Sequence, residues 1–332
     1  MKSQLTELVL DLSLPDDSAE KKTDTLENTH HYNVSCNNNH ENAAPKDSTF
    51  KNRAQAVAFR GASSGNEAIL EENPIVDSPE ETVQDRGPVS GVMMVKATFE
   101  GRGRRRVLKS TGVAINHSYI MTVAHAIWDS EFGLASSIKV IRDVRVGPSQ
   151  ENMRYVDAGA VHYRWAKNPG CTSESTRKND FAVLHVSEPF HRGIQPMAYK
   201  EPPAHPTDVS IYGFPRGEPR LRYSLSRQVK YAPNISGLLG HKGDTNHGSS
   251  GGPVIEISSG IAFGLHQGFA KKTSTTPLIN KAVLLQIHGN DPHRFMQFID
   301  DFTEENSMGD SSVVKGDEFP FGTWDAAFYR RG

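Results

Sequence analysis

Residues 88–303 contain a series of short runs rich in β-branched and aromatic residues, which are separated by clusters of Gly, Pro, Asn and Asp. Runs of this kind are typical of strands, and many in succession indicate an all-β sandwich or barrel. The predicted strands are 89–99, 107–115, 119–123, 138–146, 181–186, 209–212, 254–257 and 282–287. The apolar residues of 292–302 instead have helical spacing after an Asn-Asp turn. The sequence therefore predicts a β-rich domain that ends in a helix.

The first 86 residues have a different composition. Polar and charged stretches such as 16–22 and 37–39 carry too little apolar surface to offset the entropy of ordering. Hydrophobic residues make up only 36% of the whole chain, as expected when unpacked sequence accompanies a folded part. We therefore divide the chain into a disordered extension or propeptide (1–86), a folded domain (87–303) and a C-terminal tail (304–332).

Charge, hydropathy and cysteine content exclude several classes of protein. A formal net charge of −2 gives no electrostatic indication of a nucleic-acid partner. No apolar run reaches the ~20 residues of a membrane span, and the first residues lack the pattern of a signal peptide. Cys36 and Cys171 fall in different regions, so they cannot cross-link the folded part. We expect a cytoplasmic protein, with non-classical secretion left open.

Three segments carry chemistry: 122–126 around His125, 179–184 around Asp180 and 248–254 around Ser250. A serine hydroxyl becomes a useful nucleophile when a histidine removes its proton. A buried carboxylate fixes the tautomer of that histidine and stabilises its protonated form. Glycines beside Ser250 allow a bend in which the N–H groups of Gly248 and Ser250 form an oxyanion hole. We predict a catalytic triad of His125, Asp180 and Ser250.

Each segment alone has an ordinary structural explanation, but their order and their gaps of 55 and 70 residues favour catalysis. These motifs resemble the trypsin/chymotrypsin-like serine proteases over roughly residues 87–303. Within that clan, 211–215 (Ile-Tyr-Gly-Phe-Pro) and 264–266 (Gly-Leu-His) are most similar to V8-type glutamyl endopeptidases. The resemblance implies an all-β, chymotrypsin-like double β-barrel with a C-terminal helix and with the triad between the barrels. The chain departs from digestive trypsins at Ser249, where they have an aspartate that pairs with the freed N-terminus.

The same resemblance suggests a specificity pocket. Thr245 and His266 match the pocket residues of glutamyl endopeptidases, and both can donate hydrogen bonds to a substrate carboxylate. Asp244 argues for the opposite specificity, because an unpaired carboxylate there would attract Lys or Arg. We expect cleavage after Glu or Asp, with cleavage after Lys or Arg as the alternative. Residues 267–269 are predicted to pair with the substrate backbone.

Other candidate sites have simpler explanations. Four residues of the N-terminal extension do not match a common zinc spacing, namely His30, His31, Cys36 and His40. Arg102 and 104–106 are explained as a solvated hairpin tip. We expect no metal, no cofactor and a protein or peptide substrate, and we leave the oligomeric state open. The rival hypothesis is a non-catalytic binding module on a protease fold. A propeptide cleaved near 85–89 is a further hypothesis.

Overall fold

The computed structural model describes residues 74–78, 89–101, 103–142, 149, 152–169, 173–190, 193–231, 237–270, 279–305 and 326–330. All of them belong to one compact unit, Tyr32–Gly332. The rest of the predicted extension lies outside the described residues, as do both cysteines, Arg102, His30, His31 and His40.

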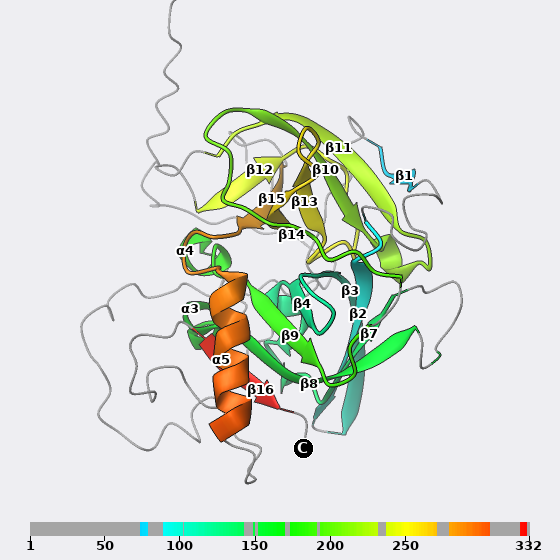
Figure 1. The fold of residues 1–332 in the computed structure, drawn as a ribbon, viewed down its shortest axis with the longest axis vertical. Helices are drawn as coiled ribbons and strands as arrows, with labels where there is room; N and C mark the ends of the chain where they lie inside the picture. Colours follow the sequence, from blue (N-terminus) through cyan, green and yellow to red (C-terminus); the bar gives the residue numbers. More distant parts are fainter. Residues whose placement is uncertain are drawn as a thin grey trace, which may run out of the picture. The chain divides into compact units, whose positions relative to one another are not determined.

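The first sheet closes into a barrel (Figure 1). Its strands are β2 (Val92–Gly101), β3 (Arg104–Ala114), β4 (Tyr119–Thr122), β7 (Ser137–Ile141), β8 (Met153–His162) and β9 (Ala182–Val186). They follow the order β8-β7-β2-β3-β4-β9, and the pairing of β8 with β9 completes the ring. A further strand, β16 (Ala326–Arg330), comes from the predicted tail and pairs with β8.

The second sheet is curled, so that β11 and β12, which are far apart in the strand order, also contact each other. Its strands are β10 (Thr207–Gly213), β11 (Arg222–Val229), β12 (Leu238–His241), β13 (Pro253–Glu256), β14 (Ala262–Ala270) and β15 (Ile279–Leu284). Their order is β11-β10-β13-β14-β15-β12. Outside β11 lies β1 (Val76–Asp77), which comes from the predicted N-terminal extension and pairs Val76 with Tyr223.

Alternating strand residues fill both interiors, as the two-residue period of a strand requires. The first core contains Met93, Phe99 and Ile120, whereas the second is built around Val209 and Phe263. The all-β architecture with two barrel-like sheets is thereby confirmed.

Helix α5 (Pro292–Glu305) confirms the predicted C-terminal helix and packs against β8 and β9 (Figure 1). Its apolar face buries Phe295, Phe298 and Ile299. The Asp291 carboxylate accepts a hydrogen bond from the backbone N–H of His293 and so caps the helix start. No helix of the described residues is long and apolar enough to span a membrane.

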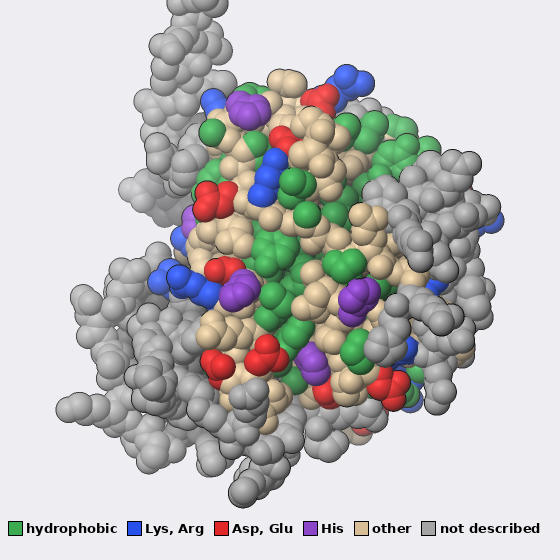
Figure 2. Space-filling model, in the orientation of Figure 1, with side chains coloured by type: hydrophobic (Ala, Val, Ile, Leu, Met, Phe, Trp, Pro, Cys, Tyr) green, Lys and Arg blue, Asp and Glu red, His purple; other side chains and the backbone are tan. Residues whose placement is uncertain are grey.

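Short elements complete the described chain. They are η1 (Ala124–Ala126), β5 (Trp128–Asp129), β6 (Gly133–Leu134), α3 (Tyr163–Lys167), α4 (Glu174–Arg177) and η2 (Pro215–Gly217). In the space-filling view of the same face, Lys and Arg lie interspersed with Asp and Glu on the described surface (Figure 2).

Candidate active site

His125 lies in the single turn η1, directly after β4. Its neighbours Ala124 and Ala126 are fully buried, so the turn is anchored on both sides of the histidine. The His125 side chain itself is 14% exposed and therefore reaches the surface of the site. The buried alanines thus hold a histidine that solvent or a substrate can approach.

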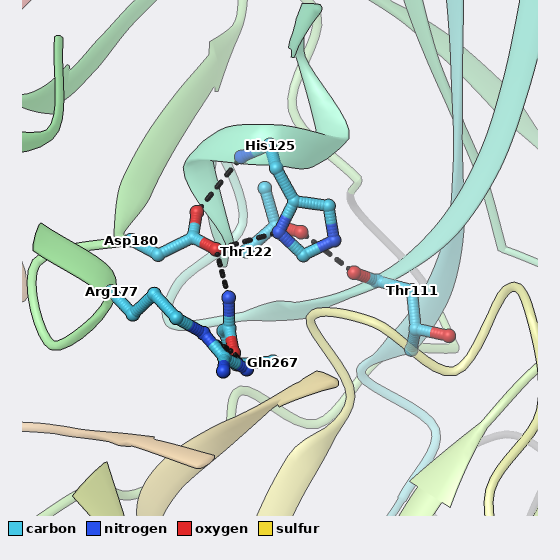
Figure 3. A network of polar contacts seen from close by, with 6 residues as sticks. All are labelled: Thr111, Thr122, His125, Arg177, Asp180 and Gln267. Carbon is cyan, nitrogen blue, oxygen red and sulfur yellow. Dashed lines mark hydrogen bonds and ion pairs between the residues drawn. The ribbon is translucent and has the colours of Figure 1, made fainter. Parts of the chain in front are cut away.

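Asp180 precedes β9, and the pairing of β4 with β9 brings it to His125. Its Oδ2 lies 2.6 Å from Nδ1 of His125, and its Oδ1 accepts from the His125 backbone N–H at 2.9 Å (Figure 3). A carboxylate at Nδ1 favours the tautomer whose proton is on Nδ1, because only that tautomer donates to it. Nε2 is then the atom that can accept a proton. The structure therefore joins two of the three predicted triad residues directly.

The Asp180 carboxylate is buried, with 1% of its side chain exposed. Burial alone would raise its pKa, but the facing His125 charge and hydrogen bonds from His125 and Gln267 hold the pKa below the ordinary value of 3.8. Asp180 is therefore ionised at neutral pH, as a partner of a histidine base must be.

Gln267 contributes a contact that sequence reasoning missed. Its side-chain amide donates to Oδ2 of Asp180 at 2.9 Å, and its carbonyl oxygen accepts from Nε of Arg177 at 3.1 Å (Figure 3). The β14–β15 pairing shifts between His266 and Gly268, so Gln267 occupies a bulge in β14. Bulges re-aim side chains next to active sites. Here the bulge lies at Gln267, whose side chain contacts Asp180, whereas the sequence predicted this residue only as part of an edge that binds the substrate backbone.

Ser250 lies in the candidate nucleophile loop, residues 244–252, between β12 and β13. Gly251 has a φ of +85°, and a Cβ there would lie 2.1 Å from the carbonyl oxygen of Thr111. A Cβ on Gly252 would lie 1.9 Å from the carbonyl oxygen of Tyr212. These close approaches require glycine after Ser250. Ser250 itself is 5% exposed, and its carbonyl oxygen accepts from the Thr111 N–H at 2.8 Å.

Gly248, the other predicted oxyanion donor, has a φ of +98°, which glycine adopts without steric cost. A Cβ there would lie 2.3 Å from the carbonyl oxygen of Phe214. The Gly248 carbonyl accepts from Oγ1 of Thr111 at 2.7 Å. The loop is thus fastened to β3 of the first barrel.

All three predicted pocket residues are buried, Asp244 and Thr245 within this loop and His266 on β14. Thr245 is 2% exposed, and its Oγ1 has no hydrogen-bond partner among the described residues. His266 is fully buried, and its Nδ1 lies 3.1 Å from Nε2 of His241. Burial, and secondly the neighbouring His266, hold the pKa of His241 well below its ordinary value of 6.5. Sequence reasoning did not find the contact of His241 with His266, because nothing in the sequence places β12 two strands from β14.

Asp244 is 3% exposed and lines a small cavity with Thr245 and Ser249. Arg222 lines the same cavity, and its guanidinium pairs with Asp77 at 2.9 Å and with Glu218 at 3.1 Å. Ile75, from the segment that carries β1, lines it as well.

The arginine-rich hairpin is matched by acidic neighbours. Arg106 lies 2.5 Å from the buried carboxylate of Asp129, and Arg104 and Arg105 lie 3.7 Å from Glu131 and Glu100. These pairs support the interpretation of a solvated hairpin. Within the part of the chain that is described, no cluster of three or more His, Cys, Asp or Glu could hold a metal ion.

Comparison with known proteins finds similarity in sequence and in fold. Residues 110–265 match the trypsin-like peptidase domain. A solved glutamyl (Glu) endopeptidase superposes with a TM-score of 0.52 at 16% identity, covering 71% of this chain and 100% of its own. The protease Anisep from Arthrobacter nicotinovorans gives 0.46 at 17% identity, covering 60% and 92%. An inactivated protease paralogue of the scabies mite gives 0.48 at 14%, covering 69% and 98%. The search of curated proteins gave no match.

Proposed function

We propose, from a trypsin-like peptidase domain on a chymotrypsin-type fold, that this protein is a serine endopeptidase. The observation that carries the proposal is the 2.6 Å contact between His125 and a buried, ionised Asp180. A glycine-bounded Ser250 loop is fastened to β3, whose partner strand β4 leads into His125. This combination supports peptidase function, because each part has a distinct chemical task.

In the proposed mechanism, Oγ of Ser250 attacks the carbonyl carbon of the scissile peptide bond while Nε2 of His125 takes its proton. The negative oxygen that forms is stabilised by the N–H groups of Gly248 and Ser250. His125, held by Asp180, then gives the proton to the leaving amine, and the C–N bond breaks to leave an acyl-enzyme. Water, deprotonated by the same histidine, hydrolyses the ester and restores Ser250.

We propose cleavage after Glu, and secondarily after Asp. Thr245 supports this specificity, because its hydroxyl is buried without a partner in the described structure and can donate to a carboxylate. His266 supports it through His241. If the neutral His241 donates from Nε2 to Nδ1 of His266, the latter carries its proton on Nε2 and can donate it to the substrate. The superposable Glu endopeptidase agrees with this reading.

Cleavage after Lys or Arg is the competing specificity, and Asp244 is the residue that would provide it. Against it, Thr245 lines the same cavity as Asp244, and its buried hydroxyl, which has no hydrogen-bond partner in the described structure, suits a substrate carboxylate rather than a cation. We therefore assign Asp244 to the support of the pocket rather than to contact with the substrate.

We further propose that 87–303 forms the protease domain, with 1–86 as an extension and 304–332 as a tail. The pairing of β1 with β11 and of β16 with β8 means that short parts of both terminal regions contact the barrels. A chain shortened to begin at Gly87 loses β1, whereas one that begins at Asn73 keeps it. The difference in activity between these two shortened chains measures what the segment that carries β1 contributes.

The test is a peptide library derived from a proteome, incubated with the full-length protein and with Ser250→Ala, with the cleavage sites mapped by mass spectrometry. Cuts after Glu that are absent with Ser250→Ala are the expected result. Cuts after Lys or Arg would retain the nucleophile and transfer specificity to Asp244. If neither the full-length nor the shortened chains cleave any peptide, the protein is a non-catalytic protease-fold module.

A further inference from the structure

Thr111 on β3 contacts both halves of the candidate site. Its amide N–H donates to the Ser250 carbonyl at 2.8 Å. Its own carbonyl accepts from Oγ1 of Thr122 at 2.7 Å, as Figure 3 shows. Thr122 is the last residue of β4 and lies three positions before His125. The Thr111 backbone thus links the strand that carries the base to the loop that carries the nucleophile.

The side chain of Thr111 makes two further hydrogen bonds with backbone groups. Its Oγ1 donates to the Gly248 carbonyl at 2.7 Å and accepts from the Phe214 N–H at 3.0 Å. The residue is fully buried, so water does not compete for these groups at its own surface. A hydroxyl is required at this point, because one atom must both donate and accept.

The peptide on the other side of Gly248 is held as well. The His247 carbonyl accepts a hydrogen bond from the N–H of Arg216, a residue with a left-handed φ of 56°. In a trans peptide the N–H points opposite to the carbonyl. The bond from Arg216 therefore sets the direction of the Gly248 N–H, while Thr111 prevents rotation on the following side.

We propose that the Thr111 hydroxyl is a positioning residue that keeps the Gly248 N–H aimed at the oxyanion of the transition state. This inference rests on the proposed function, since it assigns a task to the same site. The inference goes beyond the proposed function because it makes Thr111, an interior residue of the first barrel, responsible for the direction of the Gly248 N–H. Loss of the hydroxyl should then slow the chemical step without weakening the initial binding of a substrate.

The test compares Thr111→Val and Thr111→Ser by the rate at which an alkyl fluorophosphonate inactivates the full-length protein. Phosphonylation uses Ser250, His125 and the oxyanion donors but no specificity pocket. We expect kinact of Thr111→Val to fall by about 10- to 100-fold. The fall should not exceed the effect of removing one oxyanion donor completely, because the Gly248 N–H is misdirected and not lost. KI should stay within about threefold, and Thr111→Ser should recover most of the rate. Thr98→Val, the same change on β2 of that barrel, is the matched control.

Equal rates for the Val and Ser variants, or a loss confined to KI, would overturn the proposal. Thermal unfolding of each variant separates a positioning role from a purely structural one, because a structural role would lower the melting temperature and leave kinact of the folded fraction unchanged. If Thr111→Val yields no folded protein, Thr111→Ala removes the same hydroxyl without added bulk. A wild-type protein that takes no label refutes the proposed function itself, and the inference with it.

Discussion

Replacing Gln267 with Met should weaken both the stability and the activity of the protein. The substitution keeps the length of the side chain but removes the N–H that donates to Oδ2 of Asp180 at 2.9 Å, together with the carbonyl oxygen that accepts from Arg177. Asp180 accepts three hydrogen bonds from described residues, two from His125 and this one. The variant therefore leaves a buried carboxylate with one donor fewer.

The size of the effect follows from the charge and burial of Asp180. A hydrogen bond to a charged group contributes about 1.5–3 kcal/mol, and Asp180 is too buried for water to replace it. We expect the free energy of unfolding at pH 7 to fall by about that amount. Because 1.36 kcal/mol corresponds to a factor of ten, a similar loss in the transition state would lower kcat/KM by about 10- to 100-fold.

The difference in stability should depend on pH. The pKa of folded Asp180 is below the ordinary 3.8, so its ionised form stabilises the fold above that pH. This stabilisation is lost as the pH falls below 3.8 through the pKa of the folded state. The gap between wild type and Gln267→Met should therefore be full at pH 7 and shrink at pH 3 and below.

Urea unfolding at pH 7 and pH 3, together with kcat/KM on a peptide substrate, measures both effects. Gln195→Met is the control, since it makes the same change at an exposed side chain. The reasoning is refuted if Gln267→Met unfolds like wild type at pH 7 and retains kcat/KM within about twofold, because Gln267 would then contribute nothing to Asp180.

Three further predictions address the core of the second sheet, the pocket and the nucleophile loop. Hydrogen bonds from Lys200 and other neighbours lower the pKa of Glu256 from 4.5 to about 2. Between pH 7 and pH 3, wild type should therefore lose about 1–2 kcal/mol of stability that Glu256→Gln does not lose, a figure reduced because Lys200 is one-third exposed. Equal losses of the two proteins in urea unfolding would contradict this. Thr245→Val should lower kcat/KM for Glu substrates by about tenfold and leave fluorophosphonate labelling unchanged, since it removes a donor to the substrate carboxylate alone. Gly251→Ala should destabilise the protein by about 2–4 kcal/mol and abolish labelling. Gly101→Ala is the control and should do neither, because its Cβ would meet only ordinary contacts. A labelled Gly251→Ala protein would show that the loop tolerates a Cβ.

The strands that were predicted from the sequence are those with a continuous run of apolar, β-branched residues. β2, β3 and β4 carry β-branched runs between turn residues, and α5 carries apolar residues at helical spacing. Strand β8 was missed, because Asp157, Gly159 and small alanines interrupt its apolar pattern. Strand β11 was missed because its sequence is mostly polar, with Ser224, Ser226 and Arg227 between its apolar residues.

In the candidate site, too, the features carried by a local sequence pattern were predicted and those that depend on tertiary contacts were not. The segments around His125, Asp180 and Ser250 are local motifs, and the structure brings the first two into direct contact. The contacts of Gln267 and Thr111 instead depend on a bulge and on the approach of two sheets. Register between distant strands is set by tertiary packing, so no local pattern contains it.

Mass spectrometry of the full-length protein after reaction with a fluorophosphonate tests directly whether His125 activates Ser250 as a nucleophile. The proposed triad predicts one covalent adduct on the peptide that contains Ser250, and none in either Ser250→Ala or His125→Ala at the same concentration and time. A folded wild-type protein without an adduct, or an adduct on another serine that persists in Ser250→Ala, would contradict it.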